Sequence, residues 1–244
     1  MRKIPLYLGL VLAALAPFLP GAAAAGETKT RLELYPLEGG SLLYIGDRVT
    51  VEEQGRVTQT TVFRKAGGGG PILREVWIYD RKDLRLVSQK LENPVSGQRE
   101  ELTRVADTVK MLARENGKEE IERKDLPWEP QMAYSAIVVP TMVDEWSKLA
   151  GGGTVAFDLL VASRLGTVGF RLKKDSVARI SGEPVMVVRM EPSSWLIRRL
   201  VDPLYFFLAQ KAPHRLVEFK GRSSIRTDDG DTQDLRTVFR AVAP

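Results

Sequence analysis

The chain has 244 residues, no cysteine, one histidine and a formal net charge of +5. The missing cysteines exclude disulfides, thiolate metal ligands, thiolate nucleophiles and an acyl anchor attached through sulfur. Because basic and acidic residues are interspersed, as in Arg99, Glu100, Glu101 and Arg104, no basic face for nucleic acid is expected.

The first 25 residues have the order of a secretion signal. Arg2 and Lys3 precede the apolar run 4–19, and the small-residue stretch 21–25 supplies a cleavage site. The run is short for a bilayer-spanning helix and is interrupted by proline. We therefore predict that residues 1–25 are a removable signal peptide and that 26–244 form a single β-rich domain. That domain is expected to be periplasmic or secreted, with no transmembrane segment left after cleavage.

Short segments of alternating or β-branched character fill most of the remaining chain, with turn residues between them. This spacing is typical of an antiparallel meander. The predicted fold class is mainly β, an antiparallel curved sheet or open barrel with two short helical insertions. We predict strands at 31–35, 48–53, 57–65, 73–79, 85–91, 100–105, 108–114, 155–160, 167–173, 184–190, 216–220, 222–227 and 235–242.

Two segments have helical character. The first, 141–149, begins with Thr141 three residues before Asp144, which resembles a capping box, and ends at Gly151. The second, 193–201, stops before Pro203 because proline disfavours helical geometry in the residue preceding it.

Side chains that could act in catalysis lack suitable partners. His214 is the only imidazole, and no serine elbow or second histidine accompanies it. Glu119, Glu120 and Glu122 could in principle form an acid and base pair, but carboxylates beside basic residues are common on solvated surfaces. We predict a non-enzymatic protein with no catalytic residues.

Two loop motifs are also explained without a ligand. The stretch 228–231, with Asp234 beyond it, does not have the ligand order of a calcium loop and suits a hairpin turn. The run 67–70 is followed by Pro71 and not by Lys and Ser or Thr, so it favours a flexible hairpin over a phosphate-binding loop. No metal and no cofactor is expected.

The segment 193–208 is the strongest candidate for a binding site. Its helical part carries one apolar face, and a dense aromatic run follows Pro203. This segment could be a helix that plugs the core, a lid over an apolar cavity, or a face that touches a membrane or a partner. The candidate ligand-binding residues are Trp195, Leu196, Ile197, Leu200, Leu204, Tyr205, Phe206 and Phe207.

Three further stretches, 74–80, 97–104 and 182–190, complete a pattern of export signal, long meander and Trp/Phe/Leu-rich insertion. In this pattern the chain resembles the periplasmic lipoprotein-carrier (LolA/LolB-like) open β-barrel proteins and their uncharacterised relatives. The resemblance implies a curved sheet wrapped around helices, with an apolar interior suited to acyl chains.

Three functions remain open at this point. The first is an extracytoplasmic carrier or binder of lipid or another apolar ligand, which a curled sheet with an unfilled interior would allow. The alternative is an envelope scaffold or assembly factor that binds another protein through its sheet edges or the segment around Trp195. A hydrolase that uses carboxylates is the third.

Overall fold

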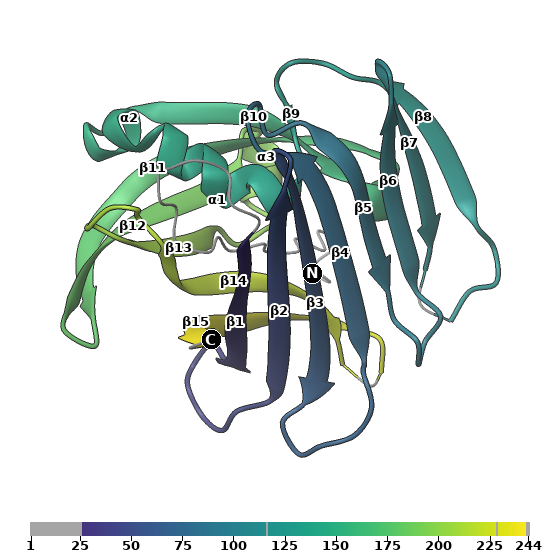
Figure 1. Cartoon of the computed structure of the whole chain (residues 1–244), viewed down its shortest axis with the longest axis horizontal. Coiled ribbons are helices and arrows are strands. Elements are labelled where there is room, and N and C mark those ends of the chain that lie inside the picture. Colours follow the sequence, from purple (N-terminus) through teal and green to yellow (C-terminus); the bar gives the residue numbers. More distant parts are fainter. Residues whose placement is uncertain (1–25, 116, 228, 243–244) are drawn as a thin grey trace.

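Figure 1 shows a computed structural model of the chain, which describes residues 26–115, 117–227 and 229–242. The predicted signal peptide, 1–25, lies outside the described residues. None of the helices in the described part is long and apolar enough to cross a bilayer.

The described chain is dominated by strands that belong to one sheet. Their bounds are β1 Gly26–Pro36, β2 Tyr44–Glu53, β3 Arg56–Lys65, β4 Leu73–Asp80, β5 Leu86–Glu92, β6 Arg99–Val105, β7 Thr108–Arg114, β8 Glu122–Pro127, β9 Met132–Ala133, β10 Thr154–Val161, β11 Gly166–Ile180, β12 Glu183–Pro192, β13 Leu204–Ala209, β14 Leu216–Arg226 and β15 Thr232–Val242.

The strand order shows how the sheet is closed and where it is open. It runs β8-β7-β6-β5-β4-β3-β2-β1-β15-β14-β13-β12-β11-β10-β9, so the first and last strands of the described chain pair in its middle. Every pair is antiparallel except β9 with β10. The two edges, β8 and β9, are consecutive in sequence. The sheet is therefore a curled, open surface whose edges are joined by one short connection.

Three helices and one 3-10 turn interrupt the strands. They are α1 Ser135–Asp144, α2 Trp146–Ala150, η1 Ala162–Arg164 and α3 Trp195–Arg198. In Figure 1, α1 lies near the upper ends of the vertical strands β1–β3, α2 lies at the upper left beside β10 and β11, and β14 and β15 cross below them.

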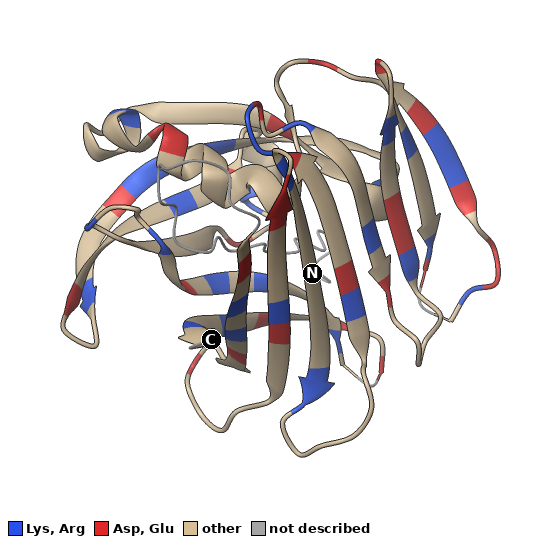
Figure 2. Cartoon of the chain, viewed as in Figure 1, with Lys and Arg blue, Asp and Glu red and all other residues tan. Residues whose placement is uncertain are grey.

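The inner face of the sheet holds the core. Along β3 and β4 the side chains alternate strictly, with Val57, Gln59, Thr61 and Phe63 buried on β3 and Leu73, Glu75, Trp77 and Tyr79 buried on β4. This period of two is the expected result of placing one face of a pleated sheet against a core. Charged residues are spread along the strands with both signs mixed, as Figure 2 shows.

The prediction of a mainly β, antiparallel and curved open sheet is confirmed. Three strands were not predicted, namely β8, β9 and β13, and the predicted strands 216–220 and 222–227 are one strand, β14, with a register shift after Arg222.

Both helix predictions were displaced. The segment 141–149 covers the end of α1 and most of α2, which separate at Glu145, and α1 begins six residues earlier than predicted. The second helix, α3, is only a single turn and none of its residues is buried. The reading of 193–201 as a core-plugging helix is therefore wrong, because α1 fills that role.

Candidate functional site

The interior of the curled sheet divides into two regions. We call the region around α1 the helix-filled half, and the region around Arg48 and Glu75 the polar half. The two halves meet on β4, where Trp77 faces α1 and Glu75, two residues earlier, faces β14.

In the helix-filled half, α1 is apolar on nearly every side. Residues 135–140 and Met142 are buried, and only the last residue, Asp144, is exposed. The helix begins after Tyr134, whose side chain makes no capping hydrogen bond. A helix with an apolar surface all round is stable only when it is surrounded by other apolar groups. The helix is therefore held by packing and not by its own ends.

Aromatic rings form the floor on which α1 begins. The ring of Tyr134 stacks on Trp77 with centroids 6.3 Å apart, and it meets Tyr79 edge-on at 6.4 Å. Trp77 and Tyr79 are fully buried. Such aromatic contacts add directional packing to the hydrophobic burial.

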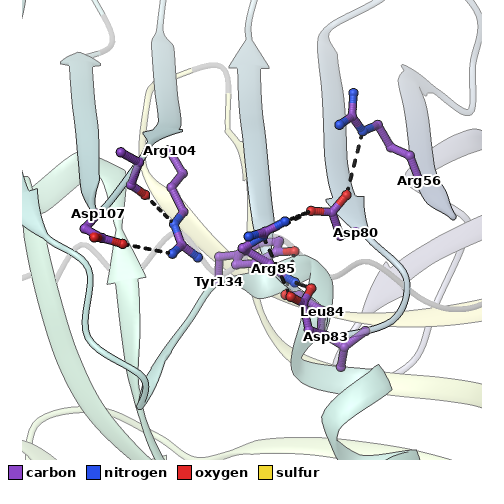
Figure 3. Close-up of polar contacts among 9 residues, drawn as sticks. Arg56, Asp80, Asp83, Leu84, Arg85, Arg104, Asp107 and Tyr134 are labelled. Carbon is purple, nitrogen blue, oxygen red and sulfur yellow. Dashed lines mark hydrogen bonds and ion pairs between the residues drawn. The ribbon is translucent and has the colours of Figure 1, made fainter.

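The segment that connects the edge strands β8 and β9 is anchored beside the helix-filled half. The Trp128 amide donates to the Asp107 carbonyl oxygen over 2.8 Å, and the guanidinium of Arg104 lies 4.4 Å from the centre of the Trp128 ring. Farther along, the Tyr134 hydroxyl donates to the Leu84 carbonyl oxygen over 3.1 Å (Figure 3). The residues that lead into α1 are thus attached to two strand turns.

The turn that accepts from Tyr134 is itself braced by ion pairs. Arg85 donates to the Asp80 carboxylate over 2.8 Å, and Arg56 lies 3.9 Å from the other carboxylate oxygen (Figure 3). The backbone amide of Arg85 also donates to Asp83. Leu84, between these residues, has a φ of 52°, a conformation that L residues adopt at some cost. The contacts of Arg85 with Asp80 and Asp83 stabilise this turn, so that the Leu84 carbonyl oxygen points toward Tyr134.

In the polar half, buried polar residues line up across the strands. Arg48 of β2 is paired with Thr61 of β3, Thr61 with Glu75 of β4, Glu75 with Leu91 of β5, and Leu91 with Glu100 of β6. All five side chains are at most 5% exposed. This row crosses the inner face perpendicular to the strands.

Hydrogen bonds satisfy much of this row. Arg48 donates to Thr61 over 2.9 Å, and Gln98 donates to Glu100 over 3.0 Å. From the opposite wall, the Ser224 hydroxyl of β14 donates to Glu75 over 2.7 Å, a contact between residues 149 positions apart. The end of β14 is thereby fixed against β4.

Burial changes the acidity of these groups. It raises the pKa of Glu75 to about 7, although the Ser224 hydroxyl and the Arg48 charge act in the opposite direction. Burial likewise raises the pKa of Glu100 and lowers that of Arg48 to about 10. The neutral form of each carboxyl is favoured because little water reaches it.

Two cavities lined by described residues are small. One of about 110 Å³ lies beside Gln98, Glu100 and Ser163, and one of about 30 Å³ lies beside Glu75 and Ser224. Ligand pockets typically enclose ~300–1,000 Å³. With α1 in place, neither cavity has room for an acyl chain.

The predicted binding residues do not form one lid. Trp195, Leu196 and Leu200 are exposed, at 60%, 57% and 41%, and Ile197 is half-buried. The aromatic run that follows Pro203 belongs to strand β13. Its side chains alternate: Leu204 and Phe206 are buried in the core, and Tyr205 and Phe207 are half-buried on the opposite face.

The remaining motifs have structural surroundings. His214 stacks on Trp146 of α2, with ring centroids 3.6 Å apart, and its Nδ1 lies 3.2 Å from the Ala209 carbonyl oxygen. Glu119, Glu120 and Glu122 are exposed. The loop 67–70 joins β3 and β4, as predicted.

Among the residues that the structure describes, no group of three His, Cys, Asp or Glu side chains could hold a metal ion. In the predicted hairpin 228–231, Asp228 lies outside the described residues. The Asp231 amide there donates to the Thr227 hydroxyl, which is the geometry of a turn between β14 and β15.

Sequence reasoning missed the polar row and the true start of α1. The alternation along β2 points the wrong way for the row, because its apolar residues Ile45, Val49 and Val51 are half-buried whereas Gly46, Arg48 and Thr50 are buried. No clear signal marks α1, whose run 136–139 of alanine and β-branched residues suits a strand equally well.

Comparison with known proteins adds little beyond this geometry. No protein-family model and no curated protein sequence matches the chain. One solved structure that it resembles is a domain assigned to outer membrane lipoprotein sorting in Vibrio parahaemolyticus, with 9% identity, a TM-score of 0.26, and coverage of 89% of this chain and 83% of that one. A likeness this slight carries no argument about function.

Proposed function

We propose that the chain is a non-enzymatic binder of lipid or another apolar ligand in an extracytoplasmic compartment, and that the ligand occupies the helix-filled half of the sheet. The observation that carries this proposal is α1, a separate piece of chain with an apolar surface on nearly every side, seated inside a curled sheet.

The space that α1 takes up matches a ligand pocket. A ten-residue helix is about 15 Å long and about 10 Å wide, so it fills on the order of 1,200 Å³. Displacing it would open more than the ~300–1,000 Å³ of ordinary ligand sites. The floor left behind would include Trp77 and Tyr79, which suit an acyl chain because they offer large apolar surfaces.

The attachments of the helix support a movable plug. Besides the packing of its buried side chains, α1 is preceded by one hydrogen bond, from the Tyr134 hydroxyl, and α2 after it adds the Trp146 stack on His214; Gly151 to Gly153 follow α2 directly. Opening would break these contacts without breaking the strand pairing of the sheet.

A fatty acid carrying a dansyl group tests the proposal. We expect saturable binding with a stoichiometry near one, and energy transfer from Trp77. In the double variant W146C/H214C, a reducible bis-thiosulfonate linker would tie α2 to the loop before β14. Because the natural chain has no cysteine, these would be the only thiols.

We expect the linked variant to lose binding and to regain it after reduction. A matched control, K90C/E101C, places the same linker on the outer face between β5 and β6, where binding should persist. Failure of the unlinked protein to bind the probe, or unchanged binding in the linked α2 variant, would contradict the proposal.

An envelope scaffold is the second candidate. It is favoured by the small size of the two cavities described above, neither of which has room for an acyl chain. In that case the dansyl probe would not bind, and the function would depend on a protein partner.

A further inference from the structure

The turn between β12 and β13 exposes an unusual amount of apolar surface. Trp195, Leu196 and Leu200 lie within six residues of one another and are all more than 40% exposed, and α3 has no buried residue. Single exposed apolar residues are ordinary on soluble proteins, but clusters of large ones mark contact surfaces.

The chemistry of this cluster suits the boundary between water and lipid. Tryptophan combines a large apolar ring with a polar N–H and is enriched at membrane interfaces. The guanidinium of Arg199 lies 4.9 Å from the centre of the Trp195 ring. An arginine in this position can keep its charge among headgroups while its stem stays with the apolar side chains.

The charge around α3 favours an anionic surface. Three arginines contact the single carboxylate of Glu191: Arg198 over 3.3 Å, Arg189 over 3.5 Å and Arg171 at a shorter distance. Arg189 also lies 4.0 Å from Asp175, so these three guanidiniums face two carboxylates. The charged residues of β11, β12 and the segment 193–202 comprise seven cations and four carboxylates: Arg171, Lys173, Lys174, Arg179, Arg189, Arg198 and Arg199 against Asp175, Glu183, Glu191 and Asp202.

The cluster also lies close to the open side of the sheet. The Ser193 amide, just before α3, donates to Gly169 of β11. Gly169 is paired with Asp158 of β10, and Asp158 with Met132 of the edge strand β9. The turn that carries α3 therefore starts two strands from the edge at which the sheet is open.

We propose that the segment 193–202 docks on the headgroup region of an anionic phospholipid bilayer, with Trp195, Leu196 and Leu200 inserted and the arginines beside the phosphates. Arginine forms paired hydrogen bonds with phosphate oxygens. A membrane that contains anionic lipids attracts these arginines more strongly than a membrane without net charge does. This inference does not depend on ligand binding in the helix-filled half.

Vesicle flotation tests it directly. The full chain would be mixed with vesicles of phosphatidylcholine alone or with phosphatidylglycerol added, while tryptophan emission is recorded. We expect binding to the anionic vesicles with a blue shift. The variant W195S/L196S/L200S should lose at least about tenfold in affinity, since each large apolar side chain contributes by burial. The variant R199Q should lose about fivefold on anionic vesicles only.

A matched control, V95S/V105S/V177S, removes three exposed apolar side chains from other turns and strands and should bind as the wild type does. The dansyl fatty acid should still bind the α3 variant, which separates this inference from the proposed function. Absence of vesicle binding, equal binding to neutral vesicles, or unchanged binding of the α3 variant would overturn the proposal. So would self-association through the same three residues, which would assign the surface to a second copy of the chain.

Discussion

The two halves of the interior are built on the same strands but closed in different ways. In the helix-filled half, a separate helix covers the sheet, and its contacts with Trp77 and Tyr79 are mainly apolar and aromatic. In the polar half, the sheet is covered by its own strand β14, and Ser224 and Glu75 are joined by a hydrogen bond.

This difference determines which half can exchange its contents. Apart from the aromatic contacts of Tyr134, the packing of α1 depends on burial and volume, which another apolar group of similar volume can provide. A buried carboxyl or guanidinium must keep specific partners, because an unsatisfied buried polar group is costly. The polar half is therefore the fixed part of the core, and the helix-filled half is the part suited to a ligand.

Removing the aromatic floor should have the largest effect on stability. Trp77→Ala empties a fully buried site beneath Tyr134, and we expect it to lower the free energy of unfolding by ~3–5 kcal/mol in urea denaturation. Val76→Ala, on the opposite face of the same strand, should cost less than about 1 kcal/mol. Equal losses in the two variants would mean that the floor of the helix-filled half is not a tightly packed region.

The polar half should make stability depend on pH through Glu75. Its pKa is about 7 in the folded chain, against 4.5 for an ordinary glutamate, so the folded state binds more protons between these pH values. Stability contributed by this group is present at low pH and falls as the pH rises through that window. The full loss corresponds to about 3 kcal/mol.

Glu75→Gln should remove this part of the pH dependence. We expect the stability of the variant relative to wild type to rise by about 3 kcal/mol from pH 4.5 to pH 8, measured by urea denaturation. The raised pKa of Glu100 gives a slope of the same sign in both proteins, so the difference between the two pH profiles reports mainly on Glu75. Parallel pH profiles for the two proteins would show that Glu75 does not titrate as its burial implies.

Ser224→Ala tests the link between β14 and β4. The hydroxyl stabilises the charged form of Glu75, so its removal should cost about 2 kcal/mol at pH 8 and less at pH 5. In the Glu75→Gln background the loss should be smaller and independent of pH, because the amide oxygen can still accept from Ser224 but carries no charge. Additive losses in the double variant would show that Ser224 acts elsewhere.

Much of the sheet could be predicted because its strands have one buried face. Strand β7 was predicted with its observed bounds, 108–114, and its buried residues Val109, Met111 and Ala113 show the alternation that made this possible. Strand β13 was missed because it is apolar on both faces, so its sequence has no period of two.

The site could be predicted much less well than the sheet. The polar row depends on which residues of β2, β4 and β6 lie opposite one another, and pairing register is not written in any single segment. The helix α1 was displaced in the prediction because Thr141 and Asp144 look like a helix start. The observed start lies at Ser135, where packing against Trp77 and Tyr79 and not capping determines the position.

The smallest expected effect bears most directly on whether α1 moves. Tyr134→Phe removes one hydrogen bond, to the Leu84 carbonyl, and should lower stability by about 1 kcal/mol. If the ligand binds only after α1 has left the interior, the same loss of closed-state stability should raise affinity for the dansyl fatty acid about fivefold. Tyr205→Phe, on the outer face of β13, should change neither quantity. A variant at Tyr134 that loses stability while its affinity stays constant would show that α1 remains seated when the ligand binds, and the ligand would then have to be placed elsewhere on the sheet.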